Sequence, residues 1–127
     1  MTKHGASLSE AIAHIRSAQD AEKALEITPH DTVELMRAGK ARILDVREPR
    51  AFAVACIAKS AIIDDALASE IIDRWPRDAQ IVLVCHHGMR SLDATHYLRS
   101  YGFTNVKSLA GGVDAWSLEI DSSVPRY

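Results

Sequence analysis

The sequence is short of the features that mark several classes of protein. It has two cysteines, Cys56 and Cys85, among 127 residues, which indicates thiol chemistry more than a disulfide scaffold. It has no apolar run of 18 residues, so we expect no membrane span, and its first residues lack the apolar core of a secretion signal. Its 15 basic and 17 acidic residues give a net charge of −2, which does not favour nucleic-acid binding. These absences make the cytoplasm the expected location.

The hydrophobic pattern of the chain predicts strands that alternate with helices. Short, β-branched or apolar runs typical of strands occupy 26–28, 41–46, 61–63, 80–84 and 106–109. Helical patterns occupy 29–38, 49–54 and 65–75, then a segment ending at Tyr101, and a short segment after Gly112. Such alternation predicts an α/β fold, with a parallel sheet covered by helices on both faces. The polar tail from Asp121 to Tyr127 is expected to be extended.

Residues 1–26 are expected to form a helical extension ahead of a domain that spans 27–127. Ser7 and Glu10 fit a capping box, and apolar residues follow at helical spacing, at Leu8, Ile12, Ile15 and Ala18. The spacing predicts a helix from about residue 8 to residue 25. Such a helix can lie on its own domain, or it can pair with a partner such as a second copy of the chain; the sequence leaves both open.

The strand at 80–84 is the most apolar run of the chain, and Cys85 follows it directly. Ligands of parallel sheets bind beyond the carboxyl ends of the strands, which is where Cys85 lies. A helix begins a few residues later, and the free N–H groups at its start favour an anion, here a thiolate or a persulfide. Gly88 lets the loop bend, and Arg90 adds positive charge and planar donors for an oxyanion. The alternative is an inert cysteine buried at a strand end.

Four segments of the chain together resemble the signatures of the rhodanese-like sulfurtransferase family. They are Leu44-Asp45-Val46-Arg47-Glu48-Pro49 with Phe52, then Val82 to Ser91, Gly102 to Val106, and Leu109 to Trp116. The Cys-His-His-Gly form of the second segment resembles a subgroup of single-domain rhodaneses. The resemblance covers roughly residues 27–117. It implies a rhodanese-like, doubly wound five-stranded parallel sheet with helices on both faces, and a sulfurtransferase activity.

The resemblance also implies roles for individual residues. Cys85 resembles the family's persulfide carrier, and the loop that wraps it is His86, His87, Gly88, Met89 and Arg90. Asp45 is expected to support the geometry of this loop, and Arg47 to pair with nearby carboxylates. The expected donor is thiosulfate or a persulfide, and the acceptor is cyanide, a thiol or a protein cysteine. No metal or organic cofactor is expected.

The chain departs from the family pattern at two positions. Relatives often have Gly-His-Ile after the first signature, where this chain has Ala55-Cys56-Ile57. We expect Cys56 to be a small, buried core residue; the alternative is a resolving thiol that attacks an oxidised Cys85. His86 stands where many relatives have arginine. The loop therefore carries less fixed positive charge, which argues against a strong preference for thiosulfate.

Other functions compete with this interpretation. Neighbouring histidines at 86 and 87 resemble a metal site, but we expect their side chains to point in different directions, and no zinc-like pair follows. Related cysteine phosphatases place five residues between cysteine and arginine, in a loop wide enough for a phosphate group. Four residues intervene here, and the shorter loop suits a single sulfur atom. A non-catalytic module is disfavoured by the presence of Cys85. A sulfur-relay or regulatory module that acts on a specific protein partner, and is slow with thiosulfate, is the main alternative.

Overall fold

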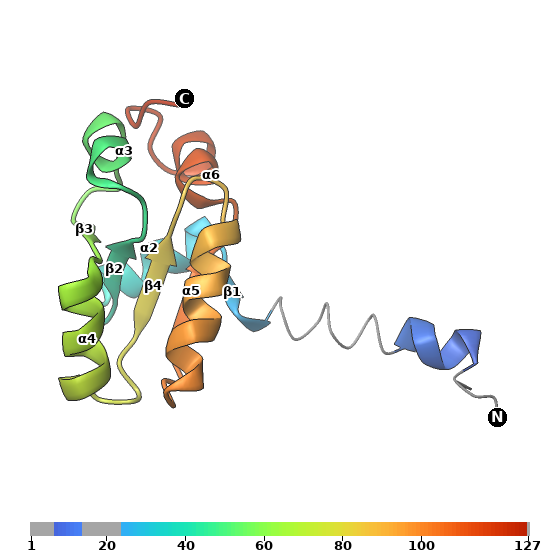
Figure 1. Cartoon of the computed structure of the whole chain (residues 1–127). Helices are drawn as coiled ribbons and strands as arrows, with labels where there is room; N and C mark the ends of the chain where they lie inside the picture. Colours follow the sequence, from blue (N-terminus) through green and yellow to red (C-terminus); the bar gives the residue numbers. More distant parts are fainter. Residues whose placement is uncertain (1–6, 14–23, 127) are drawn as a thin grey trace.

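The computed structural model describes residues 7–13 and 24–126, and its centre is a five-stranded parallel sheet in the order β1-β5-β4-β2-β3 (Figure 1). The strands are β1 Glu26–Ile27, β2 Arg42–Asp45, β3 Ala61–Ile62, β4 Ile81–Val84 and β5 Val106–Leu109. The helices are α2 Pro29–Arg37, α3 Pro49–Val54, α4 Asp65–Arg74, α5 Met89–Ser100 and α6 Gly112–Glu119. The predicted doubly wound α/β fold is confirmed, and the predicted elements between residues 26 and 119 are present within one or two residues of their expected bounds.

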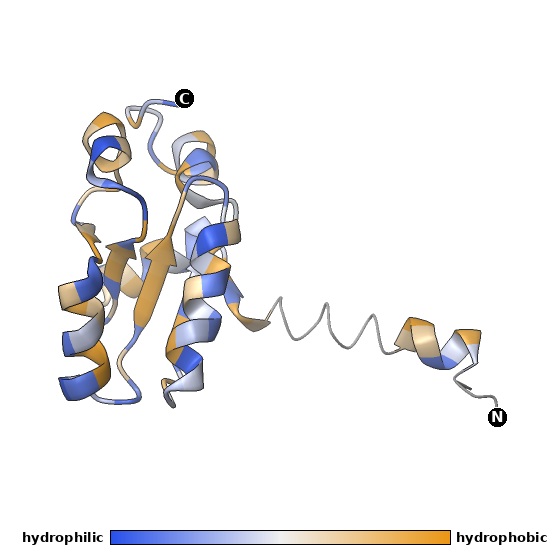
Figure 2. Ribbon diagram, in the orientation of Figure 1, coloured by the Kyte–Doolittle hydropathy of each residue, from blue (hydrophilic) through white to orange (hydrophobic). Residues whose placement is uncertain are grey.

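Alternation along the strands builds two separate cores, one on each face of the sheet. On one face, Val82 and Val84 pack with residues of α6, including Trp116, and against residues of α2. On the other face, Leu83 packs with residues of α4 and α5, among them Ile71 and Leu98. In Figure 2 β4 is hydrophobic, while the helices around it carry both hydrophobic and hydrophilic residues. Burial on both faces explains why the β4 sequence is continuously apolar.

The strand order places the carboxyl ends of the two central strands beside one another. β4 pairs with β2 on one side, where Val84 lies opposite Asp45, and with β5 on the other, where Leu83 lies opposite Ser108. The loop after β4, together with α3 and α6, lies beyond this end of the sheet (Figure 1). Residues 45, 85 and 108 therefore approach one another because of the sheet register, although they are far apart in sequence.

The ends of the chain differ in part from the sequence-based expectation. Ser7 Oγ accepts a hydrogen bond from the Glu10 amide at 3.1 Å, as the capping box predicts, but residues 14–23 of the predicted helix lie outside the described residues. The side chains of Leu8 and Ile12 in the described part of this helix are exposed. In the described part of the chain, no helix combines the length and apolar character needed to span a membrane.

The expectation of an extended C-terminal tail is wrong. The Val124 amide donates to Asp121 O at 3.1 Å, which closes a turn, and the Val124 side chain is buried in the core. The Ser117 hydroxyl donates to Val124 O at 2.6 Å and holds the turn against α6. Burial of Val124 removes apolar surface from water and helps to hold the tail against the domain.

Candidate active site

The sulfur of Cys85 lies in a cradle of hydrogen-bond donors. Cys85 is only 3% exposed, and its Sγ accepts hydrogen bonds from the amides of Gly88 at 3.0 Å and Ser91 at 3.3 Å. The hydroxyl of Ser91 lies 3.3 Å from the same sulfur. Donors that converge on one atom stabilise negative charge there more than they stabilise the neutral thiol. The arrangement therefore favours an anionic sulfur.

The first turn of α5 supplies these donors. Amides in the first turn of a helix have no acceptor within the helix, and Ser91 contributes one of them, while Gly88 is the residue that precedes the helix. Gly88 has φ +96°, a left-handed conformation that disfavours other residues. A Cβ on Gly88 would also lie 3.2 Å from the Gly111 nitrogen and from the Leu109 oxygen. Glycine at this position thus lets the loop turn tightly around the sulfur.

The start of α6 holds the other side of the loop. The Val113 amide donates to Cys85 O at 2.9 Å, and the Asp114 amide donates to His86 O at 3.2 Å. Gly112 has φ +62°, and a Cβ there would lie 2.6 Å from the carbonyl carbon of His86 and closer still to the two carbonyl oxygens. Two unpaired amides of one helix are thereby satisfied by two carbonyls of the cysteine loop, which fixes the course of that loop.

A second hydroxyl lies behind Ser91. The Oγ atoms of Ser91 and Ser108 are 2.7 Å apart, and the Ser108 hydroxyl also donates to Gly88 O at 3.3 Å. Both serines are fully buried. Together with Cys85 they form a continuous chain of polar contacts from β5 to the sulfur, so Ser108 fixes the direction in which the Ser91 hydroxyl can point.

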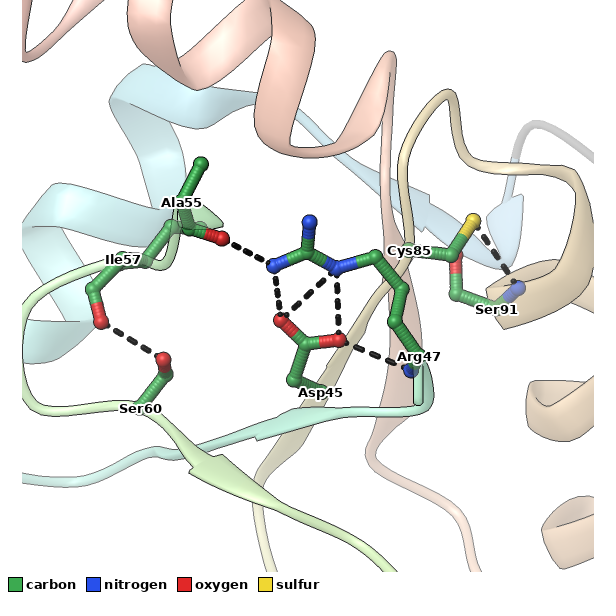
Figure 3. Close-up of polar contacts among 7 residues, drawn as sticks. All are labelled: Asp45, Arg47, Ala55, Ile57, Ser60, Cys85 and Ser91. Atoms are coloured by element: carbon green, nitrogen blue, oxygen red, sulfur yellow. Dashed lines mark hydrogen bonds and ion pairs between the residues drawn. The ribbon is translucent and has the colours of Figure 1, made fainter. Parts of the chain in front are cut away.

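Asp45 and Arg47 form a buried ion pair next to the loop (Figure 3). Arg47 Nη2 donates to Asp45 Oδ2 at 2.7 Å and to Ala55 O at 2.5 Å, and the Arg47 amide donates to Asp45 Oδ1 at 2.9 Å. The pair joins the end of β2 to the segment after α3. In Figure 3 the Cys85 sulfur is turned toward Ser91, while Asp45 and Arg47 face each other. The expectation that Arg47 pairs with a carboxylate is confirmed.

A pocket of about 440 Å³ opens in front of Cys85. Its lining includes the ion-pair residue Arg47, the carboxylate of Glu48 and, from the loop and α5, His86, His87, Met89 and Arg90. In the described part of the chain, the exposed Arg90 side chain has no ion-pair partner, and Met89 is 78% exposed. At the mouth of the pocket, Arg90 can therefore bind an anionic ligand, and Met89 can contact a ligand with an apolar surface.

The two histidines of the loop do not diverge as expected. The rings of His86 and His87 stack with centroids 4.0 Å apart and an angle of 27° between their planes. Asp114 lies near both of them and is held by Arg126, whose Nε donates to Asp114 Oδ1 at 2.8 Å. The hydrogen bond from Arg126 is the main reason that the pKa of Asp114 lies below its usual value, and the nearby histidines lower this pKa further. The C-terminal tail thus contributes a charge beside the cysteine loop.

The sequence-based site residues come together, with one correction. Cys85 and residues 86–90 form one loop, with Asp45 and Arg47 beside it. The prediction that Cys56 is buried is wrong, because Cys56 is partly exposed while Ala55 and Ile57 on either side are buried. Sequence reasoning gave no role to Ser108 or Arg126. Serine and arginine are common at surfaces, and no motif spacing separates these two from the rest.

Comparisons with known proteins support the resemblance to the rhodanese-like family. A family model for the rhodanese-like domain matches residues 28–119. The chain is 37% identical over 86 residues to the thiosulfate sulfurtransferase GlpE of Pseudomonas aeruginosa, an alignment that covers 68% of this chain and 78% of the relative. It is 36% identical over 100 residues to GlpE of Ectopseudomonas mendocina, with 79% and 91% covered.

Solved structures agree with the fold. The crystal structure of a rhodanese-related protein from Thermoplasma volcanium is 31% identical and superimposes with a TM-score of 0.58, covering 79% of this chain and 94% of that one. A human single-domain sulfurtransferase is 23% identical, with a TM-score of 0.64 and coverage of 75% and 96%. At that identity the second likeness shows the fold alone.

Proposed function

The chain belongs to the rhodanese-like domain family, and we propose that it is a sulfurtransferase that carries a sulfane sulfur as a persulfide on Cys85. The observation that carries the proposal is the convergence of the Gly88 and Ser91 amides on Cys85 Sγ at the base of an open pocket.

In the first half-reaction, the Cys85 thiolate attacks the sulfane sulfur of thiosulfate. A new sulfur–sulfur bond forms, the bond to the sulfonate group breaks, and its electron pair leaves with sulfite. The product is the anion Cys85–S–S⁻, and total charge is conserved. The exposed Arg90 at the mouth of the pocket is suited to the sulfonate end of the donor.

In the second half-reaction, a thiophilic acceptor attacks the outer sulfur of the persulfide. Cyanide would leave as thiocyanate, and a thiol or a protein cysteine would leave as a persulfide. The electron pair of the broken bond returns to Cys85 as a thiolate. The Gly88 and Ser91 amides stabilise negative charge on Cys85 Sγ, so they favour this departure.

A relay that serves a specific protein partner is the second candidate. The exposed Met89 on the rim of the pocket favours it, because an apolar side chain beside the reactive sulfur contributes little to binding a small dianion. In this version a protein cysteine, presented on a partner surface, is the donor or the acceptor, and turnover with thiosulfate is slow.

The experiment is a thiosulfate:cyanide assay on the wild type, Cys85→Ser and Cys56→Ser. We expect thiocyanate from the wild type and from Cys56→Ser, and none above background from Cys85→Ser. No thiocyanate from the wild type, together with one added sulfur on Cys85 after treatment with a persulfide, would favour the relay. Full activity in Cys85→Ser would refute both candidates.

A further inference from the structure

Three side chains beside the cysteine loop form a cluster that the sulfur chemistry does not use. One ligand atom from each of His86, His87 and Asp114 lies within 4.8 Å of the other two. The histidines come from the loop and the aspartate from the first turn of α6. The backbone bond from the Asp114 amide to His86 O holds the loop against that helix, so the cluster does not depend on side-chain contacts alone.

The members of this cluster are the ligand types that borderline transition metals prefer. Zinc binds imidazole nitrogen and carboxylate oxygen at about 2.0–2.2 Å, so its ligand atoms lie about 3.4 Å from one another in a tetrahedral site. The cluster needs to contract by little more than one ångström to reach that spacing. The stacked rings overturn one of the two reasons for which the sequence disfavoured a metal site, namely that neighbouring histidines diverge.

Arg126 would compete with a metal ion for the Asp114 carboxylate. Its guanidinium bonds both carboxylate oxygens of Asp114, with Nε at 2.8 Å and Nη2 at 3.3 Å. Arg126 is more than half exposed, and the contact is a surface ion pair. Such pairs are weak, so a divalent ion can displace the guanidinium without disturbing the core of the domain.

We propose that His86, His87 and Asp114 bind one divalent transition-metal ion of the Zn²⁺ type, in exchange for Arg126, and that the bound ion obstructs the pocket in front of Cys85. Both histidines line that pocket, so an ion held by them lies at its wall. Three protein ligands leave the fourth tetrahedral position to water. Cys85 Sγ is not part of the set, because it is buried and held by the Gly88 and Ser91 amides. The binding itself does not depend on the proposed function, whereas the expected inhibition does.

The binding test is calorimetric titration of the full chain with Zn²⁺ in a Cys85→Ser background, which removes the reactive thiol as a ligand. We expect one ion per chain. Asp114→Asn and His87→Ala should each weaken binding by about tenfold or more, and Arg126→Ala should strengthen it by about two- to fivefold, because the competing ion pair is lost. Asp121→Asn is the matched control: this carboxylate bonds Ser123 in the tail, and its loss should leave binding unchanged.

Two results would overturn the site. One is Zn²⁺ binding that is the same in Asp114→Asn as in the background protein. The other is a thiolate-to-metal charge-transfer band in the wild type loaded with Co²⁺, which would place the ion on a cysteine.

The inhibition test measures, by mass spectrometry and without cyanide because cyanide itself binds Zn²⁺, how fast thiosulfate adds one sulfur to Cys85 at increasing Zn²⁺, in the wild type and in Asp114→Asn. We expect equal activity without metal, and resistance to Zn²⁺ in the variant. Binding at the cluster with equal inhibition of both proteins would overturn the claim that the ion obstructs the pocket. An inactive wild type would contradict the proposed function and leave the calorimetric result standing.

Discussion

Replacing Gly112 with alanine should damage the cysteine loop far more than its backbone conformation alone requires. Gly112 has φ +62°, and alanine in a left-handed conformation costs roughly 1–2 kcal/mol. The new Cβ would also overlap the carbonyl groups of Cys85 and His86 and push them away from α6. The two hydrogen bonds from α6 to these carbonyls are worth roughly 0.5–1.5 kcal/mol each. We therefore expect a total loss of about 2–5 kcal/mol in the free energy of unfolding.

Gly39→Ala is the matched control for this prediction. Gly39 has nearly the same φ, +67°, but no atom lies within 4 Å of its ideal Cβ, so only the conformational cost of about 1–2 kcal/mol should appear. Urea unfolding of the two variants gives the comparison, and thiosulfate:cyanide activity of the folded proteins should fall in Gly112→Ala alone. Unfolding free energies that agree within about 0.5 kcal/mol would refute the close contact between α6 and the loop.

Three further predictions follow from the polar contacts around the loop. Ser108→Ala should lower the free energy of unfolding in urea by about 1–3 kcal/mol, because its buried hydroxyl bonds both Ser91 Oγ and Gly88 O; an unchanged value would count against these two contacts. Asp45→Asn should lower the free energy of unfolding by about 3–5 kcal/mol, because it leaves Arg47 charged and buried without its carboxylate; a smaller loss in urea would count against the buried pair. In Arg126→Ala the pKa of Asp114 should rise, as NMR titration can measure. In the wild type the pKa of Asp114 is lower in the folded state than in the unfolded state. The ion pair therefore stabilises the fold at pH values above the unfolded-state pKa, and this stabilisation is lost as the pH falls through the folded-state pKa.

Most of the fold could be predicted from the sequence because its signals are local. Proline at the first position of α2 and α3, and glycine after α2 and α5, mark helix ends without reference to the rest of the chain. The continuous apolar run of β4 predicts a strand buried on both faces. The tail was mispredicted because its position depends on a cavity for Val124 that α6 and the sheet create together.

The sequence could likewise predict only those parts of the site that depend on local signals. Cys85 and its loop are contiguous in sequence, so strand-end and helix-start rules could find them. Ser108 reaches the loop only because β5 pairs with β4 in the register that sets it opposite Leu83, and sequence spacing does not contain that register. Cys56 illustrates the same limit, since its neighbours on both sides, and not Cys56 itself, face the core.

The persulfide on Cys85 is the centre of this account, and mass spectrometry tests it most directly. The wild-type protein is treated with thiosulfate, freed of small molecules and measured intact, and then digested to locate the added mass. We predict one extra sulfur on the peptide that contains Cys85, which disappears on addition of cyanide and never forms in Cys85→Ser. An added sulfur on Cys56, or thiocyanate production without any sulfur bound to Cys85, would contradict the account.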